Sequence, residues 1–122
     1  MQYLALIYAD EGAWATFSED ERQAAYQQYF RFGEEGRAAG VVLGGEELDA
    51  TSTATTVRVR DGETLVTDGP FAELKETLGG YYLLECGSIE EACEWAARIP
   101  GASHGTVEVR PVYVDGEGGT ES

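Results

Sequence analysis

The chain has 122 residues, and 23 acidic against 8 basic side chains give it a formal net charge of −15 at pH 7. This charge repels nucleic-acid phosphates and anionic lipids, so we expect no nucleic-acid partner and no membrane surface, while a basic protein partner stays open. The length predicts one domain, and with no apolar run near the ~20 residues of a membrane span and no signal-peptide start, the expected location is cytoplasmic.

The first predicted element is a strand over residues 2–8. Apolar residues occupy both of its sides, which is typical of a strand in the middle of a sheet. Residues 9–17 are expected to form a loop that carries Trp14 and Phe17.

A helix is predicted to begin at Ser18 and to run to about Ala39, where Gly40 ends it. Ser18 and Glu21 have the S-x-x-E spacing of a capping box, which favours a helix start. One face of this helix is expected to pack on the core, and its members are Tyr26, Tyr29, Phe30 and Gly33.

A strand at residues 41–45 and a hairpin at residues 55–69 are predicted to follow. Within the hairpin, Asp61-Gly62 is a strong signal for a two-residue turn. Apolar and charged residues alternate in this segment, which predicts one strand face in the core and one face that is exposed to solvent or paired with acidic side chains.

The two faces of the hairpin carry different chemistry. Val57 and Val59 are expected on the core face, and Arg58 and Arg60 on the other. In an acidic protein these arginines, together with Arg110 of the last predicted strand, either pair with glutamates, for example Glu108, or line a pocket for an anionic ligand. Pairing is the preferred interpretation because opposite charges across strands are common in sheets.

The connection in "VTDGPFAELKETLGGYYLLE", residues 66–85, is longer than a chain reversal needs. Asp68 in its Asp-Gly-Pro turn is expected to bond backbone N–H groups, although loops on a rigid scaffold also concentrate functional groups. Asp68 is therefore the candidate catalytic acid or base. Glu73, Lys75 and Glu76 are interpreted as a solvated charge cluster.

The last predicted elements are a strand at residues 81–87, a helix capped by Ser88 and Glu91, and a strand at residues 105–114. The helix is expected to bury one stripe, which consists of Ile89, Ala92, Cys93, Ala96 and Ala97. Residues 115–122 are predicted to be a disordered acidic tail.

The cysteines and the single histidine give little sign of a site. Cys86 and Cys93 have no further Cys or His pair at ligand spacing, so both are predicted to be buried thiols, without a disulfide or zinc. His104 is expected in an exposed loop, without a catalytic partner. No phosphate loop, dinucleotide motif or Ser-His-Asp order is present, and no cofactor is expected.

The order of elements predicts an α+β domain of the ferredoxin-like, split β-α-β kind with an added hairpin. Two helices cover one face of its sheet. Because strands at both residues 2–8 and 81–87 are apolar on two sides, the other face would stay open in a single subunit. We therefore expect a homodimer that pairs sheet face on sheet face.

Four segments carry a family resemblance: "TTVRVRDGE", "TDGPFAELKETLGGYYLLE", "EACEWAARIP" and "VEVRPV". They resemble the DGPF, or YCII-related, family of small bacterial proteins over residues 1–114. The resemblance implies a ferredoxin-like fold that dimerises into an α+β barrel, and it supplies no activity. The chain has Leu74 where the usual family pattern has Thr. Some members accompany alternative sigma factors, and distant relatives with a suggested enzymatic role have a His-Asp pair, whose histidine the first helix here lacks.

The functional hypothesis is a cleft that binds a small polar molecule. It is bordered by Asp68, by Arg58 or Arg60, and by an aromatic side chain such as Tyr82 or Trp14. The preferred function is a dimeric small-molecule-binding or regulatory module. The alternative is a small-molecule enzyme that uses Asp68 as acid or base in a cleft of the dimeric barrel.

Overall fold

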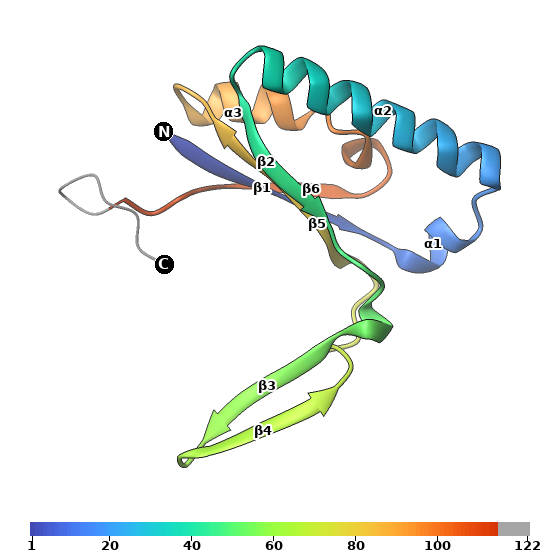
Figure 1. Cartoon of the computed structure of the whole chain (residues 1–122), viewed down its shortest axis with the longest axis vertical. Helices are drawn as coiled ribbons and strands as arrows, with labels where there is room; N and C mark the ends of the chain where they lie inside the picture. The colour runs from blue at the N-terminus through green and yellow to red at the C-terminus, as the bar shows by residue number, and fades with distance from the viewer. Residues whose placement is uncertain (115–122) are drawn as a thin grey trace.

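A computed structural model of the protein describes residues 1–114, so the predicted tail at residues 115–122 lies outside the described residues. Its elements alternate between strands and helices along the chain (Figure 1). They are β1 (Gln2–Ala9), α1 (Glu11–Ala15), α2 (Glu19–Ala38), β2 (Val42–Glu47), the 3-10 helix η1 (Thr51–Thr53), β3 (Thr55–Arg60), β4 (Glu63–Asp68), β5 (Thr77–Glu85), α3 (Ile89–Ala96), the 3-10 helix η2 (Pro100–Ser103) and β6 (Thr106–Pro111).

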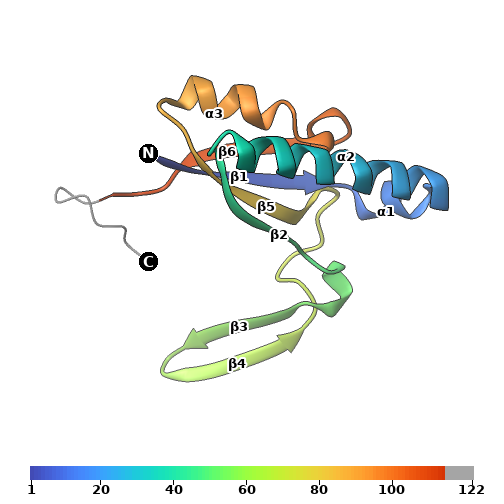
Figure 2. The ribbon, with the colours of Figure 1, turned by 45° about the horizontal axis from the view of Figure 1, so that its top comes forward.

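The main sheet has four antiparallel strands in the order β2-β5-β1-β6. The two strands predicted to be apolar on both sides, β1 and β5, are the central ones. Helices α2 and α3 lie together on one face of this sheet, and the opposite face is left open (Figure 2). The α+β class is thereby confirmed, while the dimeric barrel stays a prediction.

The core lies between the two helices and the sheet. Tyr3, Ala5 and Ile7 of β1 are buried on the helix side, which leaves the alternate β1 residues on the open face. Leu84 of β5 and Ile99 after α3 are its largest fully buried side chains. No helix among residues 1–114 is long and apolar enough to cross a membrane.

The predicted start of α2 is confirmed. Ser18 Oγ accepts a hydrogen bond from the Glu21 amide at 3.1 Å, and the Glu21 carboxylate accepts one from the Ser18 amide at 2.9 Å. Both bonds satisfy amide donors that the first helical turn leaves without a partner.

The predicted core face of α2 was partly wrong. Phe30 is 63% exposed, whereas Phe32 is 4% exposed and packs its ring 5.0 Å from that of Tyr82. Glycine explains the rotation of this face, because a Cβ on Gly36 would lie 2.3 Å from Cγ2 of Val42. The helix packs on β2 through a glycine, and the spacing of the aromatic residues did not predict this contact.

The hairpin forms with the predicted turn but not with the predicted burial. Asp61 and Gly62 both have positive φ, 53° and 76°, as a two-residue hairpin turn requires. However, β3 and β4 pair only with each other, and the hairpin stands away from the main sheet on the side opposite to the helices (Figures 1 and 2). Val57 and Val59 are 60% and 59% exposed, so the expectation that they enter the core is wrong for the single chain.

Two smaller predictions are corrected. The expected loop before α2 contains the short helix α1, whose N-cap Asp10 accepts a hydrogen bond from the Gly12 amide at 2.9 Å. Of the two cysteines, Cys86 is buried and Cys93 is exposed, because Cys93 falls on the outer side of α3. At the start of α3, Ser88 Oγ caps the Glu91 amide as predicted.

Candidate functional site

A groove of about 1110 Å³ opens at one end of the main sheet. Four chain segments meet there: the end of β1 with α1, the first half of α2, the end of β2 with the following loop, and the start of β5. Figure 1 shows α1 beside the end of β1 and near the first turns of α2. The antiparallel order of the strands brings the ends of β1 and β2 and the start of β5 to the same edge.

Aromatic rings form one wall of the groove. Tyr26 and Tyr29 are three residues apart on α2 and therefore share its groove side. Trp14 of α1 meets Tyr26 edge to face, with 5.8 Å between ring centroids. Tyr82 reaches the groove from β5, and Gly45 leaves room for it, since a Cβ there would lie 2.8 Å from Tyr82 Cδ1.

The tyrosine hydroxyls of this wall stay protonated at neutral pH. Burial raises the pKa of Tyr29 and of Tyr82, and the proximity of Tyr29 adds to the increase for Tyr82. The pKa of Tyr26 is also raised, first by desolvation and then by the Glu47 carboxylate, which accepts a hydrogen bond from Tyr26 Oη at 3.2 Å. The wall thus presents apolar faces together with neutral hydroxyl donors.

Carboxylates surround the aromatic wall. They are Asp10, Glu11, Glu46, Glu47 and Asp49. Glu11 accepts hydrogen bonds from the amide and hydroxyl of Thr51, at 2.9 and 2.5 Å, and so ties α1 to η1 across the groove. These bonds hold the Glu11 carboxylate in place without neutralising its negative charge.

Arg22 is the one basic residue among the described residues that line the groove. Its Nη2 donates to the carbonyl of Ala15 at 3.2 Å, at the C-terminal end of α1, and its guanidinium lies 5.9 Å from the Trp14 ring centroid. The negative end of the α1 dipole and the indole face therefore hold this positive charge. The groove keeps a strong excess of negative charge.

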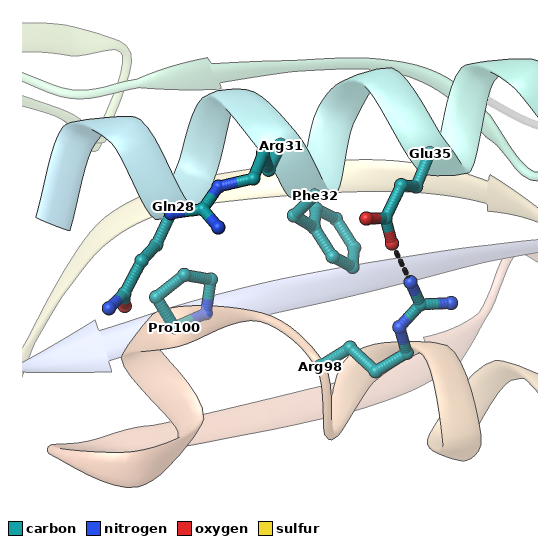
Figure 3. A pocket seen from close by; sticks show the side chains of 6 residues that line it. All are labelled: Gln28, Arg31, Phe32, Glu35, Arg98 and Pro100. Atoms are coloured by element: carbon teal, nitrogen blue, oxygen red, sulfur yellow. Dashed lines mark hydrogen bonds and ion pairs between the residues drawn. The ribbon is translucent and has the colours of Figure 1, made fainter.

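A second, smaller hollow of about 320 Å³ lies between α2 and the segment that follows α3 (Figure 3). An ion pair between Arg98 and Glu35 borders it, and Arg31 and Gln28 lie toward its other end. The Arg98 guanidinium also stacks 4.2 Å from the centroid of the Trp95 ring. Because these contacts already engage Arg98, the larger groove is the stronger candidate site.

The sequence-predicted site residues fall into two groups. Trp14 and Tyr82 both line the groove. Asp68, Arg58 and Arg60 lie on the hairpin and do not line it, so the single chain does not bring the predicted cleft together.

The side chain of Asp68 is exposed and makes no hydrogen bond with another residue of the described chain. The turn is held instead through Gly69, whose amide donates to the Ala54 carbonyl at 2.7 Å and whose carbonyl accepts a hydrogen bond from Thr56 Oγ1 at 2.8 Å. The expected bonding of Asp68 to the turn backbone was wrong.

The remaining charged candidates are exposed. The expected pairing is confirmed for Arg110, which forms an ion pair with Glu108 at 3.0 Å. It was wrong for the hairpin arginines, because Arg58 and Arg60 form no ion pair within residues 1–114. His104 is exposed as predicted, with its ring 6.0 Å from that of Phe17. The Glu73, Lys75 and Glu76 side chains are also exposed, and Glu76 accepts a hydrogen bond from Thr106 Oγ1 at 3.1 Å.

Sequence reasoning missed several groove residues. Tyr26 and Tyr29 were assigned to the core, and Arg22 and the acids at the end of β2 were not singled out. The length of α2 gave no signal for the groove, because 20 helical residues span about 30 Å, which is also about the length of the nine-residue strand β5. No group of three or more His, Cys, Asp or Glu within residues 1–114 is placed to hold a metal ion.

Comparisons with known proteins give a family match and a relative. The family model described as the YCII-related domain matches residues 1–114. The chain is also 41% identical over 128 residues to an uncharacterized protein of Rhizobium meliloti (strain 1021), with 96% of this chain and 98% of that protein covered. Neither comparison carries an activity.

Proposed function

The chain belongs to the YCII-related family, and on this premise we propose that it is a homodimeric binding module whose groove takes a small organic cation. The observation that carries the proposal is the composition of the groove, in which aromatic side chains are surrounded by five carboxylates and accompanied by one guanidinium. A ligand of this class would combine a protonated amine with an apolar body.

Two forces select a cation over an anion. The faces of Trp and Tyr rings attract an ammonium group by about 0.5–1 kcal/mol at exposed sites and about 2 kcal/mol when the cation is desolvated. The carboxylates attract the same charge at longer range and repel an anion. Arg22 does not reverse this preference, because it contributes one positive charge against the five carboxylates among the lining residues.

Catalysis by Asp68 finds no support in the single chain. Asp68 lies at the end of β4, is exposed, and does not border the groove. A catalytic acid or base needs to lie within hydrogen-bond reach of the bound substrate. The binding function is therefore preferred.

The test uses three probes of similar shape and different charge: 2-phenylethylamine, 2-phenylethanol and 3-phenylpropanoate. Titration calorimetry at pH 7 is expected to show the amine binding most tightly, the alcohol more weakly and the carboxylate not measurably. The affinity for the amine is expected to fall with added salt, because the groove charge is screened. Equal or tighter binding of the carboxylate would refute the cation preference.

Three variants locate the site. Trp14→Leu is expected to weaken amine binding about tenfold by removing one aromatic face, and Glu47→Gln to weaken it less, because the amide keeps an acceptor for Tyr26 while losing the charge. Tyr113→Leu is the matched control, since Tyr113 is 63% exposed and does not line the groove. Unchanged affinity in Trp14→Leu would place the ligand elsewhere.

We also propose that the homodimer forms through the open faces of the main sheets. In support, Leu4 and Leu6 of β1 pair with Leu83 and Tyr81 of β5, and all four lie on the face opposite to the helices. Light scattering after size exclusion is expected to give twice the chain mass of 13.2 kDa at micromolar concentration. A stable monomer would overturn the dimer.

A further inference from the structure

The β3–β4 hairpin has two chemically different faces. Val57 lies directly across from Val66, and Val59 lies two residues further along β3, so the three valines share one face. The other face carries Arg58 and Arg60, with Leu65 across from Arg58. The hairpin is therefore amphipathic, which is typical of a strand pair that packs one face against another element.

The valine face is uncovered in the single chain. Val57, Val59 and Val66 are 60%, 59% and 64% exposed, and no other element within residues 1–114 packs over them. A two-stranded hairpin is marginally stable at best in water and needs a further strand or another packed element. The hairpin needs an apolar surface from outside its own chain.

We propose that this surface belongs to a second copy of the chain: each subunit uses its hairpin as an arm that lays the valine face on the part of the partner's open sheet face that the sheet-on-sheet contact leaves free. This inference rests on the sheet-face homodimer proposed above and names the part of the chain that holds it. In a two-fold dimer the contact occurs twice, so both arms and both open faces are covered together.

The position of the hairpin favours this occupant. In both views it projects on the side of the main sheet that the helices leave open (Figures 1 and 2). A partner that docks face to face therefore arrives on the side where the arm stands.

The arginines of the arm stay in water in this arrangement. Arg58 and Arg60 lie on the face opposite to the valines, with Glu63 directly across from Arg60, so they point away from the partner's sheet when the valine face is covered.

The first test measures dimer dissociation by sedimentation. Val57→Thr/Val66→Thr keeps side-chain shape and β propensity while making the face polar, and is expected to weaken the dimer at least a hundredfold because each dimer contains both arms. Ile89→Thr/Val114→Thr is the matched control, since both side chains are also partly exposed but lie outside the arm, and it is expected to change dissociation by less than threefold.

The second test identifies the contact. A photoreactive benzoylphenylalanine at position 59 is introduced into isotopically heavy chains, which are mixed with light chains, and cross-linked peptides are identified by mass spectrometry. The expected products join the heavy arm to light peptides from β1 or β5. Cross-links confined to a single chain, or joined to the partner's helices, would overturn the arm placement.

The outcomes distinguish the arm contact from the sheet-face dimer on which this inference rests. A wild-type dimer whose dissociation is unchanged by Val57→Thr/Val66→Thr refutes the arm and leaves the sheet-face dimer standing. A wild-type monomer refutes both. A weakened dimer together with heavy-to-light cross-links to β1 or β5 supports both.

Discussion

The helix-covered face of the main sheet and the β3–β4 hairpin are built from similar strands and end in opposite environments. On the covered face Leu84 and Ala5 are both 0% exposed, whereas on the hairpin Val57 is 60% exposed. Alternation in a sequence shows that a strand has an apolar face, but it does not show which chain covers that face. The hairpin therefore points to a contact that the single chain does not contain.

The largest expected effect is on the covered face. Leu84→Ala is expected to lower the free energy of unfolding by about 3 kcal/mol, because it opens a cavity among packed neighbours. Leu65→Ala is the matched change on the hairpin, where Leu65 is 42% exposed, and it is expected to cost less than about 1 kcal/mol. Urea unfolding at a fixed protein concentration measures both. Equal losses of unfolding free energy in the two variants would contradict the contrast between the covered face and the hairpin.

The two thiols give a second contrast between covered and uncovered positions. Burial raises the pKa of the Cys86 thiol, and Glu91 and Glu85 add to the increase, so little reactive thiolate forms at pH 8. Cys93 is exposed. Ellman's reagent is expected to label Cys93 at least tenfold faster than Cys86 in the folded protein.

Single-cysteine variants decide this prediction. Cys93→Ser is expected to remove the fast phase of labelling, and Cys86→Ser to retain it. Unfolding in urea should make the remaining thiol of either variant react fast. A fast phase that survives in Cys93→Ser would contradict the burial of Cys86.

Much of the fold was predictable because its signals are local. The apolar residues on both sides of β1 placed it at the centre of the sheet, Ser18 and Glu21 marked the start of α2, and Asp61-Gly62 marked the hairpin turn. Each depends on residues close together in the sequence. The burial of the hairpin was not predictable in this way, because it depends on how the chain leaves β2.

The candidate site was predicted only in part. Trp14 and Tyr82 were singled out as aromatic side chains at the border of a ligand cleft, and both line the groove. Asp68 was chosen for its unusual turn, and the turn lies on the hairpin instead. The groove arises where four distant segments meet, and spacing along the chain does not encode their convergence.

A smaller effect is expected at the N-terminus of α2, the longer of the two helices that cover the sheet. Ser18→Ala removes the side-chain acceptor of the Glu21 amide and is expected to lower the free energy of unfolding by about 1 kcal/mol. Ser52→Ala, at an exposed position in η1 beside the hairpin, is the matched control and is expected to change it by less than about 0.5 kcal/mol. Similar losses in urea unfolding would show that the cap does not stabilise the covered face.

The smallest expected effect is the pH dependence of the same cap. Hydrogen bonds from the backbone and then the side chain of Ser18 lower the pKa of Glu21 in the folded state. A carboxylate with a lowered folded pKa stabilises the fold above its unfolded pKa, near 4.5, and this contribution is lost as the pH falls through the folded value. Glu21→Gln keeps an acceptor for the Ser18 amide and does not titrate.

Relative to the wild type, Glu21→Gln is therefore expected to gain melting temperature as the pH is lowered from 6 to 3. Glu19→Gln is the control, because Glu19 lies in the same first turn and is not part of the capping box. Melting curves at half-unit pH intervals measure the difference between the two variants. Parallel profiles would mean that the Glu21 carboxylate is not held by the cap in solution, and the contrast between α2 and the uncovered hairpin would then depend on core packing alone.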